Sequence, residues 1–198
     1  MTILQPTSPE LGGSPSPDAP RTPPVWVNLL NVAGFYAGWF ACVLGLAWGW
    51  PLLGPLAAVA IVGLHLALRS DRRAEAVAIV WVVAFGPWID ASLAHLGVAS
   101  FREPLLLGVL APPSLFALWA IFATTFDASL GWLGQRPLLA AAFGGVGIVP
   151  TYYAAERMGA VDLDPVAWAW IVPTALLWGL GVPLLFRLAT WARARAAA

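Results

Sequence analysis

The feature that most constrains this chain is a succession of long apolar stretches, separated by prolines and short charged segments. At 1.5 Å per residue, a helix of about 20 apolar residues crosses the roughly 30 Å hydrocarbon core of a bilayer. Charged residues make up 10% of the 198 positions and hydrophobic residues 60%, whereas about a quarter of an ordinary soluble domain is charged. We therefore predict an all-α, polytopic membrane helix bundle that has the lipid bilayer as its partner.

Six of the apolar stretches are long enough to cross the membrane, and we predict six transmembrane helices. The breaks between them carry helix-end signals, such as Pro51 and the charged run 69–73. The apolar segment 104–111 is followed by Pro112-Pro113, which should prevent it from continuing as a helix into the fourth span. We therefore expect a short interfacial helix or a re-entrant piece over 104–111. The predicted spans run approximately over 26–47, 51–68, 75–96, 113–132, 137–156 and 166–190.

The first 24 residues differ from the rest of the chain. They hold seven prolines among small and polar residues, a composition that buries too little apolar area to fold. We predict a disordered, proline-rich cytoplasmic tail over 1–24, and we do not expect a signal peptide because a basic start and an apolar core are missing. The six-helix transmembrane domain is expected over 25–192, followed by a short basic cytoplasmic end over 193–198.

Arginine placement predicts the orientation of the bundle, since all ten cationic side chains are arginines. With the N-terminus inside, eight of them fall in cytoplasmic segments, and only Arg102 and Arg157 fall in external ones. Positive charge concentrates on the cytoplasmic side of membrane proteins. We therefore expect a multi-pass protein of the bacterial inner (cytoplasmic) membrane with both termini in the cytoplasm.

Composition also excludes several classes of function. The formal net charge is zero, so the chain lacks the basic face that nucleic-acid binding needs, and we expect no nucleic-acid partner. One cysteine, Cys42, and two histidines do not supply a zinc ligand set, so no metal and no cofactor are predicted. No glycine-rich phosphate loop or nucleophile elbow is present. Other membrane proteins remain candidate partners.

One group of polar residues lies toward the external side of the predicted spans. Asp90 is the deepest ionisable residue and follows Pro87 by one turn; an isolated charge at membrane depth costs about 2.5–3.5 kcal/mol on insertion scales. It is either a functional acid or a tie between helices, and Tyr152 and Thr151 are the expected hydrogen-bond donors in the second case. The candidate outer polar cluster comprises Asp90, His95, Thr151, Tyr152 and Glu156.

A second group lies toward the cytoplasmic side. The first two predicted helices are joined by a short turn, so they are antiparallel neighbours, and Asn31 and His65 then lie at comparable depth. Thr124 and Asp127 lie near the end of the fourth predicted helix. The candidate inner polar cluster comprises Asn31, His65, Thr124 and Asp127.

Several strings of the chain resemble those of a bacterial inner-membrane family known as domain of unknown function 2878. The resemblance covers about residues 28–190 and implies the membrane fold and location, but no activity. The association of the family's genes with those for modified fatty acids implies a role linked to lipids. The strings stand at 31–42, 86–90, 119–125, 129–132 and 144–152.

Three functions remain open at this point, and no catalytic residue is assigned. The first is an accessory or scaffold protein in membrane-lipid or fatty-acid modification. The second is a small transporter or proton-coupled carrier that uses Asp90 and Glu156, which should show an inverted repeat of three helices and a polar cavity near the midplane. The third is an intramembrane lipid-modifying enzyme, which should bring two or more titratable groups within hydrogen-bond reach.

Overall fold

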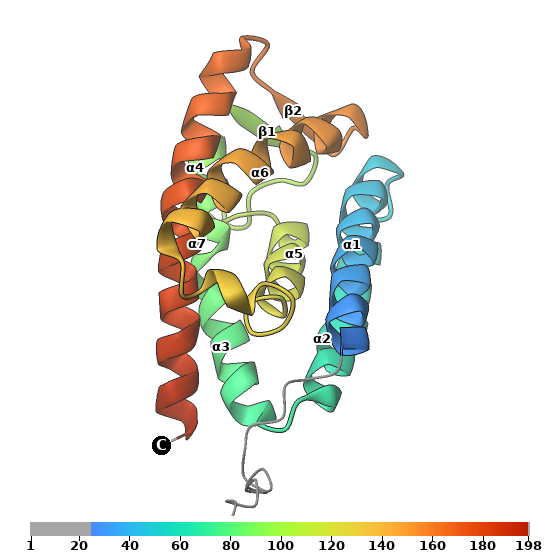
Figure 1. Ribbon diagram of the computed structural model, residues 1–198. Coiled ribbons are helices and arrows are strands. Elements are labelled where there is room, and N and C mark those ends of the chain that lie inside the picture. Colours follow the sequence, from blue (N-terminus) through green and yellow to red (C-terminus); the bar gives the residue numbers. More distant parts are fainter. Residues whose placement is uncertain (1–24, 198) are drawn as a thin grey trace, which may run out of the picture.

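The computed structural model describes residues 25–197, so the predicted tail over 1–24 lies outside the described residues. The described chain is helical apart from two short strands and the connecting loops (Figure 1). The elements are α1 (Val25–Ala47), α2 (Leu53–Leu68), α3 (Arg72–Phe85), α4 (Pro87–His95), β1 (Ala99–Phe101), α5 (Pro113–Ala123), the short 3-10 helix η1 (Gly131–Leu133), α6 (Pro137–Arg157), β2 (Val161–Leu163) and α7 (Ala167–Ala197).

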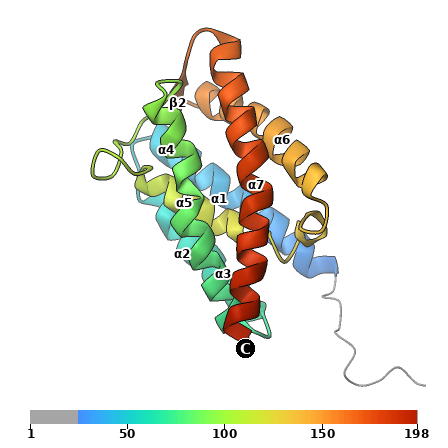
Figure 2. The same ribbon diagram turned by 90° about the vertical axis from the view of Figure 1, so that its left-hand side faces the viewer.

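The helices form two groups with α5 between them. One group is the α1–α2 hairpin, and the other contains α3, α4, α6 and α7; α5 contacts both (Figure 1). In the second group α7 runs beside α3, while α6 crosses α7 at an angle (Figure 2). Because α1 and α6 belong to different groups, they do not pack tightly on each other, and this separation creates the pocket described below.

Four helical segments are long and apolar enough to cross a membrane: α1, the α3–α4 segment Arg72–His95, α6 and α7. The other two, α2 and α5, have 16 and 11 residues, about 24 and 16 Å of helix. Six transmembrane helices are therefore not confirmed. The predicted span 113–132 is not one helix: α5 ends at Ala123, the backbone N–H groups of Thr124 and Thr125 donate to carbonyls only three residues back, and turns follow.

The outer surface of the bundle supports a membrane protein. Large apolar side chains are exposed on several helices, including Leu138 at 85%, Val59 at 74% and Leu180 at 68%. Soluble monomers rarely expose such broad apolar surface, whereas lipid tails solvate it without cost. The coarse prediction of a helical membrane protein is confirmed to this extent.

Several predicted helix boundaries need correction. The third span is broken into α3 and α4 at Gly86, because Pro87 lacks the N–H that would continue the helix. The last helix does not end near 190 but continues to Ala197. Residues 193–197 of the predicted basic end are thus part of α7, and Arg193 pairs with Glu75 of α3 there; residue 198 lies outside the described residues.

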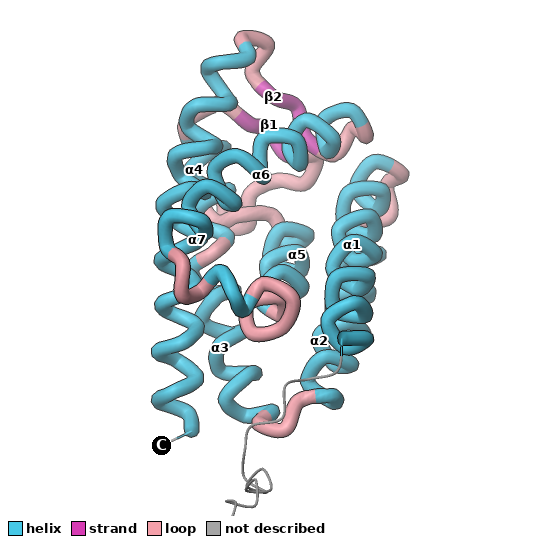
Figure 3. The backbone as a smooth tube through the Cα atoms, in the orientation of Figure 1, coloured by secondary structure: helices cyan, strands magenta, loops and turns pink. Residues whose placement is uncertain are grey.

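Two antiparallel strands, β1 and β2, were not predicted. They pair Ala99 with Leu163 and Phe101 with Val161. The strands lie at the same end of the molecule as the α1–α2 turn (Figure 3), and we call this end the hairpin end. Of the two alternatives expected for 104–111, the short interfacial helix is wrong, because this segment is a loop with a bridge between Leu106 and Leu110; the re-entrant alternative stays a prediction. The tip of this loop has positive φ at Leu107 and Gly108, which a right-handed helix does not allow.

The opposite end, which we call the C-terminal end, is where α2 ends, α3 begins and α7 ends (Figure 1). The first described helix, α1, also begins in this half of the molecule.

The contact between α6 and α7 depends on small residues. A Cβ on Gly144 would lie 2.5 Å from the carbonyl oxygen of Trp178, and one on Gly145 would lie 2.8 Å from that of Ala175. The absence of a side chain at these two positions lets the backbones of α6 and α7 approach closely.

Candidate functional site

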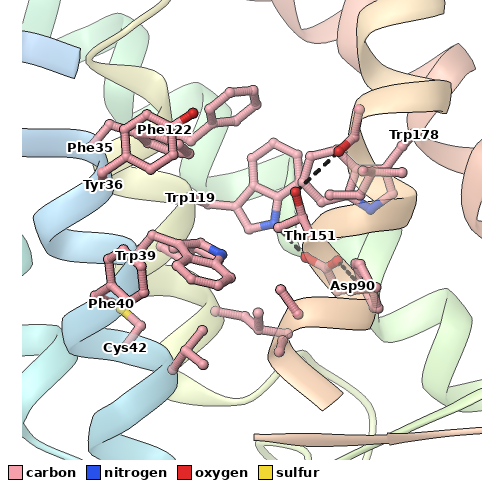
Figure 4. Close-up of a pocket in the computed structure, with 18 of the residues that line it drawn as sticks. Phe35, Tyr36, Trp39, Phe40, Cys42, Asp90, Trp119, Phe122, Thr151 and Trp178 are labelled. Carbon is pink, nitrogen blue, oxygen red and sulfur yellow. Dashed lines mark hydrogen bonds between the residues drawn. The ribbon is translucent and has the colours of Figure 1, made fainter. Parts of the chain in front are cut away.

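A pocket of about 650 Å³ lies between α1, α5 and α6. Its walls are almost entirely apolar, and aromatic side chains of α1 face α5 and the acidic residue Asp90 across it (Figure 4). Three of its lining residues, Tyr36, Phe40 and Phe143, are also exposed on the outer surface, so the pocket opens sideways between α1 and α6. Among the other lining residues are Phe35, Trp39, Cys42, Leu118, Trp119, Phe122, Gly147, Ile148, Thr151, Tyr152 and Trp178.

Asp90 is the only carboxylate among the described residues that line this pocket. It stands in the first turn of α4, directly after the break at Pro87, and is 1% exposed. Its Oδ2 accepts a hydrogen bond of 2.6 Å from Trp119 Nε1 on α5, and its Oδ1 accepts one from the Tyr152 hydroxyl on α6. Asp90 therefore ties three helices together and at the same time borders the pocket.

Two stacked indoles accompany the carboxylate. The rings of Trp119 and Trp178 lie with their centroids 4.7 Å apart and an interplanar angle of 20°. Trp119 fits against the α3–α4 break because position 86 is glycine: a Cβ there would lie 2.4 Å from the Trp119 ring. The buried Trp178 Nε1 has no hydrogen-bond partner. We call Asp90, Trp119, Tyr152 and Trp178 the Asp90 site.

The Asp90 site contains no cation. The residues that line the pocket include no Arg, Lys or His. Within the described part of the chain, arginines pair with acidic residues at Arg193–Glu75 and Arg69–Asp127, and His65 contacts Glu75, but none of these contacts involves Asp90. Neutral donors alone satisfy this carboxylate.

The structure brings together only two members of the candidate outer polar cluster, Asp90 and Tyr152. The Thr151 hydroxyl lines the pocket but donates to the Gly147 carbonyl at 3.1 Å. His95 is exposed, with its Nε2 2.9 Å from the Val109 carbonyl oxygen. Glu156 accepts a bond of 3.3 Å from the backbone N–H of Leu163. The last two residues fasten the loops of the hairpin end rather than joining the Asp90 site.

The candidate inner polar cluster divides into three separate contacts. Asn31 Nδ2 donates to Thr124 Oγ1 at 3.0 Å and Ser129 donates to Asn31 Oδ1 at 2.7 Å, so these side chains join α1 to the end of α5. His65 instead contacts Glu75. Asp127 forms an exposed ion pair with Arg69. Asn31 and Thr124 are thus the only pair of the four in contact within residues 25–197.

Sequence reasoning missed the buried Glu75. This residue is 2% exposed; its Oε1 lies 3.0 Å from His65 Nε2, and its Oε2 accepts a 2.7 Å bond from Arg193 Nε. We call His65, Glu75 and Arg193 the Glu75 network. The short α2–α3 turn was a usable signal, since it places the last turn of α2 beside the first turn of α3.

Trp119 and Trp178 were also missed as site residues. Both lie inside helices rather than at helix ends, where the interfacial tryptophans of membrane proteins gather. Their position within the apolar segments was the signal that could have identified them. No group of three or more metal-ligating side chains occurs within the described residues.

Comparison with known proteins gives one match. A family described as "Protein of unknown function (DUF2878)" matches residues 28–184, which include every member of the Asp90 site and two of the three residues of the Glu75 network. Neither the curated proteins nor the solved structures contain a match to the chain.

Proposed function

The chain belongs to the family described as Protein of unknown function (DUF2878), and on that premise we propose that it binds a long-chain membrane amphiphile in the pocket between α1, α5 and α6. In this role it is an accessory protein of membrane-lipid or fatty-acid modification. The observation that carries the proposal is the pocket itself: a mostly apolar cavity of about 650 Å³ in whose wall the Asp90 site supplies the only carboxylate among the described residues.

The size and lining of the pocket suit such a ligand. Binding sites for small molecules are commonly about 300–1,000 Å³, mostly apolar, with a few polar groups that fix the ligand's orientation. Exposed Tyr36 and Phe40 on α1 and Phe143 on α6 border the opening. An amphiphile can enter here from the lipid without passing through water, its chain along the aromatic wall and its polar head at the Asp90 site.

An intramembrane lipid-modifying enzyme is the second candidate. Asp90 and Tyr152, two titratable groups, share a hydrogen bond at the pocket wall, as an acid–base role requires. Recovery of the bound amphiphile distinguishes the two functions: a binding protein returns it unchanged, and an enzyme returns a product with a new mass.

The third candidate function, a small transporter or proton-coupled carrier, has less support. An inverted repeat would make α1 and α2 the counterparts of α5 and α6, but α1 packs along α2 while α5 makes no comparable contact with α6. The cavity is apolar rather than polar, and Glu156 is engaged with the hairpin end.

The proposal includes a location and an orientation. The protein lies in the bacterial inner membrane with the C-terminal end of the bundle facing the cytoplasm, because Arg69, Arg72 and Arg193 gather there. Both termini are then cytoplasmic. Reporter fusions after Arg73 and Ala198 should report the cytoplasm, and a fusion at Asp162 the external side. A cytoplasmic signal at Asp162 would overturn this orientation.

Amphiphile binding is tested with a photoactivatable alkyl probe and a matched pair of variants. A Cβ on Gly147, which lines the pocket, or on Gly63, which does not, would meet nothing within 4 Å. Gly147→Leu should therefore fill the pocket without disturbing the fold, and Gly63→Leu adds the same side chain outside it. Cross-links should map to the pocket-lining parts of α1 and α6 in wild type and Gly63→Leu, and fall several-fold in Gly147→Leu. Equal labelling of these segments in all three proteins would contradict the proposal.

A further inference from the structure

The charge of the Asp90 site is not balanced by the protein. Both oxygens of Asp90 are hydrogen-bonded, Oδ2 to Trp119 Nε1, which can only donate, and Oδ1 to the Tyr152 hydroxyl, so the site can hold this carboxyl group in its ionised form. An ionised group at membrane depth needs an opposite charge or a water-filled cavity. The pocket is apolar and none of its lining residues is cationic. A cation from outside the described chain would complete the site.

The surroundings of the carboxylate also suit a cation. Trp119, Trp178 and Tyr152 border the pocket beside Asp90, and the two indoles are stacked on each other. The faces of aromatic rings, tryptophan above all, attract ammonium groups, and the attraction strengthens when the contact is shielded from water. A carboxylate beside aromatic rings is a combination that recognises ammonium heads.

The same lining argues against anionic and zwitterionic heads. A carboxylate or phosphate next to Asp90 would meet a like charge with no Arg, Lys or His in the pocket wall to offset it. In a phospholipid the ammonium is joined to a phosphate by a short linker, so both groups would enter the apolar pocket together. An ammonium head without a neighbouring phosphate avoids this cost.

The depth of the site fits an amphiphile rather than a free cation. Asp90 stands five residues before His95, the last residue of α4, which is about 8 Å of helix. A head group bound there lies just inside the hairpin end, and the pocket extends away from it along α1 and α6 to Phe35, Val32 and Phe143. The aromatic wall of α1 faces Asp90 across this space (Figure 4).

We propose that the ligand of the pocket is a phosphate-free, long-chain amine, whose ammonium group pairs with Asp90 and lies against the Trp119 and Trp178 rings. This inference rests on the proposed function, because it assigns the head group of the amphiphile that the pocket binds. Asp90 acts as the counter-ion of the ligand, and Tyr152 and Trp119 hold the carboxylate in position.

The test uses four probes of one chain length: a primary alkylamine, an alkyl alcohol, an alkyl carboxylate and a lysophosphatidylethanolamine. Binding is measured at neutral pH, where the amine is protonated, to protein in nanodiscs of uncharged lipid, with empty nanodiscs subtracted. Wild type should bind the amine at least about tenfold more tightly than the alcohol, and the other two probes more weakly still. Asp90→Asn should remove the preference for the amine and leave alcohol binding unchanged.

The outcomes separate this inference from the proposed function. If all four probes bind equally and Gly147→Leu weakens them all, the pocket binds amphiphiles but the amine assignment is wrong. Tight binding of the carboxylate or of the lysophospholipid also overturns the assignment. If no probe binds above empty nanodiscs and the photo-cross-links are absent, the proposed function fails as well. Should Asp90→Asn not fold, the ranking of the four probes on wild type decides alone.

Discussion

The α3–α4 segment buries two carboxylates, Glu75 near its start and Asp90 near its end, and the surroundings of the two are opposite in character. Glu75 has two basic partners, His65 from α2 and the guanidinium of Arg193 from α7. Asp90 has only neutral donors, Trp119 from α5 and Tyr152 from α6. Each carboxylate joins three helices, so burial and hydrogen bonding alone do not distinguish their roles.

Charge balance and the adjoining space make the difference. The charge of Glu75 is offset within the protein, so the Glu75 network needs no further component to be stable. Asp90 borders a large apolar pocket that supplies no cation. The comparison indicates that the first carboxylate serves the fold, while the second also serves a ligand. Variants at the two sites can separate these roles.

The largest loss of stability is expected from Glu75→Gln. The substitution leaves His65 and Arg193 without their anion in a buried setting, and removal of one partner of a buried ion pair costs about 3 kcal/mol or more. The melting temperature in detergent should fall further than in Gly144→Leu or Asp90→Asn. Glu156→Gln is the control, since that side chain makes a single backbone contact of 3.3 Å. Equal melting temperatures for Glu75→Gln and this control would show that the Glu75 network does not stabilise the bundle.

A smaller loss of stability is expected from Gly144→Leu, because Gly144 lies on the face of α6 that packs on α7. A Cβ at this position would lie 2.5 Å from the Trp178 carbonyl oxygen, and overpacking of this kind costs about 1–3 kcal/mol. Gly147→Leu, less than one turn further along, meets nothing within 4 Å. The two leucine variants should therefore differ in melting temperature, and similar values would contradict the described contact between α6 and α7.

The smallest effect on stability is expected from Asp90→Asn. The amide keeps the shape of the carboxyl group and still accepts from one of its two donors, and interhelical hydrogen bonds in membranes average about 0.6 kcal/mol. The melting temperature should stay close to that of wild type. A fall as large as that of Glu75→Gln would remove the contrast between the two carboxylates and leave Asp90 as a structural tie.

Much of this arrangement was accessible from the sequence. Hydropathy predicts a helical membrane protein, and the depth of Asp90 beside Pro87 singles out that residue, with Tyr152 as its expected donor. These features depend on composition and on spacing along one helix. The short length of α5 was not predicted, because hydropathy does not mark the residue at which the backbone leaves the α-helix for a series of turns.

Other parts depend on contacts between distant segments. Arg193 reaches Glu75 across 118 positions of sequence, and the β1–β2 pair joins residues on either side of α5 and α6. The pocket arises because α1 and α6 do not pack tightly on each other, a property that neither helix shows in its own sequence. For the same reason the partners of His65 and Asp127 were not predicted.

The roles of the two carboxylates are distinguished most directly by measuring two quantities for each protein: alkylamine binding per folded molecule and the melting temperature. The proteins compared are wild type, Asp90→Asn and Glu75→Gln. Opposite outcomes are expected for the two variants. Asp90→Asn should melt like wild type and bind at least about tenfold more weakly, whereas Glu75→Gln should melt at a clearly lower temperature and, while folded, bind like wild type. Unchanged binding in Asp90→Asn, or binding that falls in step with stability in both variants, would contradict the assignment of Asp90 to a ligand and Glu75 to the fold.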